Sequence, residues 1–244
     1  MLVALTLEPD HAPLNPAPSL LWRKPQAELA EVVIETAMAG MASGDRTDDF
    51  FRAVWILGLL GSSIRSPQSY VHSPVTAAVY ESSGVGETLD RLIEVIPQAG
   101  LDEVRQLDDI ARTELYPHLS PPVHLHPWMG NDFVQAEADI ISNGPLLDIK
   151  SGRGTANSAG VFGFLPRPQD LYQVLIYALL NRREPKERYG PVTHVGFYFA
   201  RYGTFLTWPL EELVRELSGR DLDLDGQCQT VIVLADQESY DPLS

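Results

Sequence analysis

Residues 138–152 read ADIISNGPLLDIKSG and decide the fold of the second half of the chain. Apolar and polar residues alternate from Val134 to Ile140, which predicts a strand over residues 132–142. Asn143-Gly144 is a strong two-residue hairpin turn signal, and PLLDIKS then forms the returning strand. Because a strand directs residues i and i+2 to one face, an acid and a base, Asp148 and Lys150, lie side by side where their neighbours favour burial.

The hairpin turn also fixes which residues lie opposite each other. A two-residue turn at 143–144 places Asp139 across from Asp148, at a Cβ separation of about 4.5–5.5 Å. Two carboxylates that close repel unless a cation lies between them, and Mg²⁺ prefers oxygen ligands of this kind. The backbone carbonyl of Ile149 could supply a further oxygen. Lys150 faces the same cavity and could stabilise charge on a phosphate, so this face is suited to metal-assisted phosphodiester hydrolysis.

A helix with two polar residues on one face follows the hairpin. The segment PQDLYQVLIYALLNRR, residues 168–183, predicts a helix that begins near a proline. Gln173 and Tyr177 are spaced i, i+4, so they share one side of this helix. A glutamine and a tyrosine among leucines and isoleucines need hydrogen-bond partners if buried. We expect the lysine or a bound substrate strand to provide them.

The remaining segments of this half complete a small sheet. The Gly/Ser-rich stretch 151–164 predicts a loop, and residues 193–203 and 204–210 predict two strands joined at Tyr202-Gly203. Residues 209–219 predict a short helix that ends at Gly219, and residues 229–236, QTVIVLAD, predict a last strand. The expected class is α+β, or mixed α/β, with a small central mixed sheet flanked by helices.

The preceding half is expected to be helical. Residues 1–25 are a proline-rich leader, and residues 26–120 carry the periodicity of about five helices separated by Gly, Pro and Ser. We expect this helical region to pack on, or contribute to, a core formed by residues 121–244.

Charge is distributed unevenly along the 244 residues. The net charge of −15 argues against broad adhesion to nucleic acid or anionic membranes. Residues 150–201 nevertheless carry a net charge of +5, with eight basic and three acidic residues. A local phosphate-binding surface is therefore expected there, and its candidate nucleic-acid contacts are Arg153, Arg167, Arg182 and Arg183.

Cysteine usage and hydropathy limit the possible settings. The single cysteine, Cys228, rules out an intramolecular disulfide and a four-cysteine iron–sulfur or zinc site. The first residues lack the basic start of a secretory signal, and the longest apolar stretch, residues 53–61, is too short to span a bilayer. We expect a cytoplasmic protein without a membrane partner.

The ordered set of an Asp on a strand, a hairpin, D-x-K and a helix with Q-x-x-x-Y resembles the RecB-like branch of the PD-(D/E)XK nuclease superfamily. The resemblance covers roughly residues 130–205. It implies a restriction-endonuclease-like core and a Mg²⁺- or Mn²⁺-dependent nuclease that acts on DNA in defence, phage defence included, in repair or in recombination. It also implies two metal ligands, Asp139 and Asp148, a catalytic lysine, Lys150, and a supporting motif on the flanking helix, Gln173 and Tyr177.

The sequence departs from the family pattern upstream of this set. Many RecB-like enzymes have G-x-x-x-H in an upstream helix, whereas this chain has Gly86 followed by Asp90 at the histidine position. Glu87 and Asp90 are the two candidates for an additional metal ligand from that helix. The cysteines of iron–sulfur relatives are absent, so no cluster is expected.

Several alternatives stay open from the sequence. Asp148 and Lys150 could form a simple surface pair, and His124 and His126 share a strand face but have no third metal ligand. Glu137 shares a face with Asp139 and is expected to support the site or face solvent. The chain could also be a catalytically inactive nuclease-fold protein that binds nucleic acid or serves as a scaffold beside a helicase or another defence or repair subunit. Exonuclease or endonuclease action, DNA or RNA as substrate, and homo-oligomer formation are left undecided.

Overall fold

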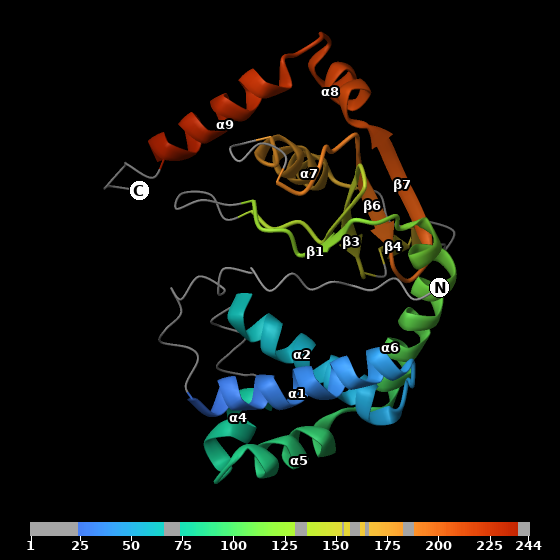
Figure 1. Cartoon of the computed structure of the whole chain (residues 1–244), viewed down its shortest axis with the longest axis vertical. Helices are drawn as coiled ribbons and strands as arrows, with labels where there is room; N and C mark the ends of the chain where they lie inside the picture. The colour runs from blue at the N-terminus through green and yellow to red at the C-terminus, as the bar shows by residue number, and fades with distance from the viewer. Residues whose placement is uncertain are drawn as a thin grey trace. The chain divides into compact units, whose positions relative to one another are not determined.

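The computed structural model describes residues 24–65, 74–129, 136–152, 154–156, 162–163, 166–182 and 188–238. They belong to two compact units that divide between Asp108 and Asp109. Taken together the two units define an α+β protein with one five-stranded mixed sheet, as the sequence predicts at the level of class (Figure 1).

The first unit is built from helices. They are α1 (Lys24–Ser43), α2 (Asp48–Arg65), α4 (Pro74–Glu81), α5 (Val85–Val95) and α6 (Gln98–Ile110). Thr47 caps α2 by accepting the Phe50 N–H at 3.3 Å, and Asp48 and Asp49 occupy its first turn, where carboxylates suit the helix dipole. The helices enclose an apolar core that includes Leu29, Ile56 and Leu92, each fully buried.

The second unit holds the sheet, whose strand order is β1-β2-β3-β6-β7. Its strands are β1 (Val123–Leu125), β2 (Ile140–Ser142), β3 (Pro145–Lys150), β6 (His194–Phe199) and β7 (Thr204–Pro209). Strands β3 and β6 run parallel, and the other neighbours are antiparallel. The parallel pair needs a crossover connection, which is supplied by α7 (Pro168–Leu180) (Figure 1).

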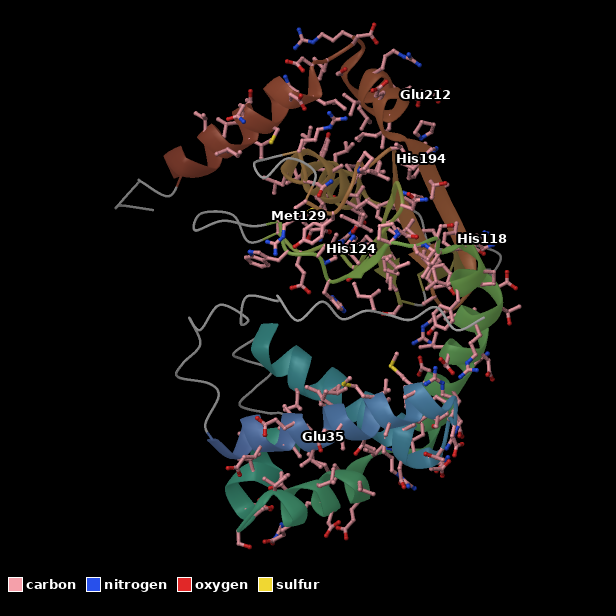
Figure 2. The ribbon with its side chains drawn as sticks, viewed as in Figure 1. Glu35, His118, His124, Met129, His194 and Glu212 are labelled. Atoms are coloured by element: carbon pink, nitrogen blue, oxygen red, sulfur yellow. The ribbon has the colours of Figure 1, made fainter. Side chains whose placement is uncertain are left out.

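Both faces of the sheet are covered. On one face Ile141, Leu146, Val195 and Phe197 pack with Val174 of α7 in a single buried cluster. On the other face Leu147 and Tyr198 pack with residues of η1 (Ala111–Leu115), a π-helical turn followed by the 3₁₀ turn η2 (Tyr116–His118). His118 of η2 contacts the ring of Phe205 in β7, with centroids 5.2 Å apart (Figure 2).

Two helices follow β7 in the described residues, and the second corrects the sequence prediction. α8 (Leu210–Ser218) ends at Gly219, which adopts a left-handed φ of 70°, as expected of a helix C-terminus. Residues 229–236, predicted as a strand, lie instead within α9 (Leu224–Glu238), which packs against α7. Asp223 accepts backbone N–H groups of Asp225 and Gln227 at its start. The buried Leu224 and Cys228 are four residues apart and share one face of α9; of the apolar run that follows, Val231 and Ile232 pack against the core, whereas Val233 and Leu234 are exposed.

The strand expected over residues 132–142 is shorter than predicted. β2 begins only at Ile140, and residues 130–135 lie outside the described residues. Pairing continues before β2, because Ala138 N–H donates to Pro127 O and Met129 N–H to Ala136 O. His126, with a φ of 50°, and Pro127, which has no N–H, interrupt the regular ladder there. The predicted loop after β3 also contains a short hairpin, β4 (Thr155–Ala156) and β5 (Phe162–Gly163).

Candidate active site

The hairpin that carries the site has the register predicted from the sequence. Ile140 pairs with Leu147 and Ile141 with Leu146, across a turn in which Asn143 and Gly144 have φ values of 40° and 121°. A Cβ at Gly144 would lie 2.7 Å from Thr193 Oγ1, so both conformation and space favour glycine. Asp139 immediately precedes β2, one position before the paired Ile140.

Lys150 lies between two carboxylates, of which the sequence predicted one. Its Nζ is 2.8 Å from Asp148 Oδ2 and 3.0 Å from Asp170 Oδ1. Asp148 and Lys150 are in register with Phe197 and Phe199, whose rings belong to the cluster beneath α7. The acid and the base of β3 therefore face α7 and the core, and the interpretation of a simple surface pair is wrong: their side chains are only 10% and 17% exposed.

Asp139 adds a second carboxylate from the hairpin. Its Oδ2 accepts the Ile149 N–H at 2.6 Å. Within a strand the N–H and C=O of one residue point to the same side, so the Ile149 carbonyl also points toward Asp139. The Lys150 carbonyl points the opposite way, since it accepts the Ala200 N–H at 3.0 Å from the β6 side. The Asp139 carboxylate and the Ile149 carbonyl therefore lie on the β2 side of β3, whereas the Asp148 side chain faces α7.

Electrostatics show that Asp148 is held in an unfavourable setting. Burial raises the pKa of its carboxyl; Lys150 lowers it, and the charges of Asp139 and Asp170 raise it further. Its Oδ2 is buried and has no hydrogen bond from the described residues, because the Lys150 contact lacks hydrogen-bond geometry. For Lys150, burial lowers the pKa, but hydrogen bonds and attraction from Asp148 and Asp170 outweigh it, so the pKa is raised.

Asp170 is the site residue that the sequence prediction missed. It is the third residue of α7, where its Oδ2 accepts the Arg167 backbone N–H at 2.8 Å and approaches Arg167 Nε at 3.3 Å. Burial raises the pKa of Asp170, but the Arg167 and Lys150 hydrogen bonds outweigh it and lower the pKa to about 2. A proline at the start of a helix followed by an acid in its first turn indicates a cap, and that signal stands three residues before Gln173.

Gln173 and Tyr177 share the side of α7 that carries Asp170. The three residues are spaced i, i+3 and i+7, and Gln173 Nε2 donates to Tyr177 Oη at 2.7 Å. Gln173 and Tyr177 are each half-buried, and this hydrogen bond satisfies a polar group of both side chains at the edge of the α7 core. The sequence predicted that Lys150 or a substrate strand would be the hydrogen-bond partner of Gln173 and Tyr177. In the structure the two side chains bond each other instead.

The four predicted nucleic-acid contacts differ in their placement. Arg167 contacts Asp170 and leaves 75% of its side chain exposed, next to the Lys150 carboxylates. Arg182 Nη1 pairs with Asp225 at 3.1 Å, which offsets its charge. Arg153 and Arg183 lie outside the described residues.

The two upstream acids belong to the helical unit. Asp90 and Glu87 are both exposed on α5. The Glu87 carboxylate accepts the Ser83 N–H at 2.8 Å and the Ser83 hydroxyl at 2.7 Å, and it pairs with Arg91. These hydrogen bonds, the Ser83 backbone first, lower the pKa of Glu87 to about 2. Glu87 therefore serves its own helix N-terminus, and its role as a metal ligand stays a prediction, as does that of Asp90.

His124 of β1 and His126, which follows this strand, are engaged with neighbouring side chains. His126 Nδ1 lies 2.9 Å from Glu137 Oε1, and the His124 ring meets the Tyr189 ring edge-on at 5.2 Å (Figure 2). Across the described ranges no group of three or more His, Cys, Asp or Glu side chains is arranged to hold a metal ion.

The donor set can be tested against the divalent ion that the family resemblance implies. Two carboxylates, Asp148 and Asp170, contact the buried cation Lys150, and a third carboxylate, Asp139, accepts the N–H of the intervening Ile149, so acids outnumber Lys150 around this part of β3. Asp148 Oδ2 is a buried oxygen without a hydrogen bond, next to a second carboxylate. Carboxylate and carbonyl oxygens are the ligands that Mg²⁺ and Mn²⁺ prefer, so the chemistry of these donors suits such an ion, whereas their arrangement in the described residues does not form a metal-holding group.

Searches of protein-family models, of curated proteins and of solved structures find no match to this chain. None of the helices that the structure describes is long and apolar enough to cross a membrane.

Proposed function

We propose that this protein is a divalent-metal-dependent nuclease that hydrolyses phosphodiester bonds of DNA. The observation that supports it most is that Asp148 and Lys150 lie on one face of β3, beneath the polar side of α7, while the Asp139 carboxylate is bonded to the N–H of the residue between them. Acids and a lysine in this arrangement suit reactions in which a phosphate gains negative charge.

The residues have separate roles in this proposal. Asp139, Asp148 and the Ile149 carbonyl would hold Mg²⁺ or Mn²⁺, which when bound supplies a Lewis acid for the phosphate. Lys150 reaches the same face from the next outward position of β3 and would orient water or stabilise charge on the phosphate. Gln173 and Tyr177 line the α7 side, and the exposed Arg167 offers a cation to the DNA backbone.

Cleavage by purified variants tests the proposal. The full chain with Mg²⁺ or Mn²⁺ is expected to cut DNA, and Asp148→Ala and Lys150→Ala are expected to lose at least a hundredfold of the rate. Asp225→Asn, a carboxylate loss in the first turn of α9, is the matched control that should keep the rate. Circular dichroism checks that each variant is folded. Equal cutting by wild type and both site variants would refute the assignment and indicate a contaminating nuclease.

The engagement of Glu87 supports a second candidate, a nuclease-fold protein that binds nucleic acid or a partner subunit without cleaving. An acid that caps its own helix is less available as the third ligand of a catalytic ion. Calorimetry with Mn²⁺ separates the two candidates. Heat of binding that Asp148→Ala abolishes supports the enzyme, whereas DNA binding without any Mn²⁺ binding supports the non-cleaving protein.

A further inference from the structure

We propose that Asp170 is a positioning residue that holds Lys150 in the site when Asp148 turns to the metal ion. This inference deepens the proposed nuclease function and rests on it for its catalytic meaning. It concerns a residue outside the D…D-x-K…Q-x-x-x-Y pattern, and it is carried by the contacts around a single ammonium group.

The geometry of Lys150 shows a shared partner. Its ammonium contacts Asp148 at 2.8 Å and Asp170 at 3.0 Å, and of the two only the Asp170 contact has hydrogen-bond geometry. The charge of Asp139 acts on Asp148, so Asp148 is the carboxylate expected to share the ion with Asp139 in the proposed nuclease site. A carboxylate that binds a divalent cation attracts an ammonium group less. Without Asp170, Lys150 would then be a partly buried cation whose remaining partner is the face of the Phe197 ring, 5.5 Å away.

Asp170 is fixed well enough to act as that second partner. Its side chain is 5% exposed, and its two oxygens are divided between two tasks. Oδ2 accepts the Arg167 backbone N–H and contacts Arg167 Nε, which anchors the carboxylate to the first turn of α7. Oδ1 is thereby directed at Lys150, so the helix that crosses from β3 to β6 also sets the position of the lysine.

The position of the lysine can be observed without metal or activity. The chain has three lysines, Lys24, Lys150 and Lys186, so the ¹H–¹⁵N spectrum of the ammonium groups is simple. The hydrogen bond to Asp170 and the ion pair with Asp148 should slow hydrogen exchange enough for Lys150 to be detected, and its signal is assigned by its loss in Lys150→Met. We expect Asp170→Asn to remove or shift this signal and Asp225→Asn to leave it unchanged. An unchanged signal in Asp170→Asn would overturn the proposal.

A second experiment shows whether Asp170 acts through Lys150. Mn²⁺ affinity is measured by calorimetry for wild type, Asp170→Asn, Lys150→Met and the double variant. When Asp170 is replaced, the Lys150 ammonium has only Asp148 as a carboxylate partner, so it competes with the ion for Asp148. Asp170→Asn should therefore weaken Mn²⁺ binding roughly tenfold when Lys150 is present, which is the scale of one charged hydrogen bond. In the Lys150→Met background the same change should alter it less than twofold. Equal weakening in both backgrounds would mean that Asp170 acts by its charge or by helix capping alone, and would refute the positioning role.

The two proposals can fail separately. If the wild type neither binds Mn²⁺ nor cuts DNA, the nuclease assignment fails, and the ammonium spectrum still decides whether Asp170 positions Lys150. If the wild type cuts DNA and the Lys150 signal ignores Asp170, the nuclease assignment stands and this inference falls. Should Asp170→Asn not fold, Asp170→Ser keeps an oxygen for the Arg167 N–H and replaces it in both experiments.

Discussion

Replacing Lys150 by methionine is the perturbation whose effect the structure specifies best. The lysine is 17% exposed, and the Asp148 and Asp170 side chains around it are 10% and 5% exposed. Removal of one partner from a buried ion pair typically costs 3–5 kcal/mol, because the remaining charge has no partner. Arg167 still contacts Asp170 in the variant, which places the expected loss at the lower end, about 3 kcal/mol in the free energy of unfolding.

The same reasoning predicts that a second substitution restores part of the loss. Burial already disfavours the charged form of Asp148, so Asp148→Asn alone should cost no more than about 1 kcal/mol. In the Lys150→Met background it removes an unpaired buried carboxylate, and it should therefore return about 2 kcal/mol. The pair Arg182 and Asp225, 3.1 Å apart with side chains 23% and 50% exposed, is the control. Its coupling should stay below about 1 kcal/mol.

Urea unfolding with EDTA present measures these free energies, and the fluorescence of Trp208 reports on the sheet unit. Trp208 meets Phe197 edge-on at 6.2 Å, so its emission should change when the sheet unfolds. The other tryptophans are replaced by phenylalanine in all variants, which separates this unit from the helical one. Two results would refute the view that Lys150 balances buried carboxylates. One is a loss of less than about 1 kcal/mol in the free energy of unfolding for Lys150→Met, and the other is a loss in the double variant Asp148→Asn/Lys150→Met that equals the sum of the two single losses.

Three further predictions concern neighbouring positions. Gly196→Ala should lower the free energy of unfolding by about 1–3 kcal/mol in urea titrations, because a Cβ at this position would collide with the Leu206 carbonyl of the paired strand. An unchanged urea midpoint would show that β6 and β7 can separate. Tyr177→Phe should cost about 1 kcal/mol, since it removes the hydrogen bond from Gln173, and should leave Mn²⁺ affinity within twofold in calorimetry; a larger effect on Mn²⁺ would place the pair at the ion. Asp170 has its pKa lowered to about 2, so its stabilisation is complete above its ordinary value near 3.8 and is lost as the pH falls through 2. The stability difference between wild type and Asp170→Asn should therefore shrink by about 2 kcal/mol between pH 5 and pH 2 in acid titrations, and a constant difference would contradict this assignment.

The hairpin was predictable because its determinants are local. Asn143-Gly144 fixes the turn, the turn fixes the register, and the alternation of apolar residues fixes the face, so the pairing of Ile140 with Leu147 and of Ile141 with Leu146 follows from 15 residues. The same holds for the i, i+4 pair of Gln173 and Tyr177. Each of these relations is set within one element or one turn.

The role of Asp170 was not predictable in this way. It lies 20 residues after Lys150, beyond a glycine-rich loop, and the contact depends on how α7 crosses over the sheet. The sequence indicates that Asp170 caps the helix, but it does not indicate the direction in which the second carboxylate oxygen of Asp170 points. The final helix was missed for a different reason, because an uninterrupted apolar run such as TVIVLA has neither the period of a strand nor that of a helix, and only packing against α7 decides it.

The energetic setting of the site itself favours a function over a structural role. Positions 148 and 150 face a cluster of Phe197, Phe199 and other apolar side chains, where hydrophobic residues of similar size would be at least as stable as an ion pair. Asp148 in particular is buried with a raised pKa and an oxygen that lacks a hydrogen bond. A group held in a state that the surrounding fold disfavours becomes favourable once a cation binds beside it. The variant Asp148→Asn should therefore be nearly as stable as the wild type and yet lose Mn²⁺ binding, and it is this separation of stability from binding that a purely structural ion pair would not produce.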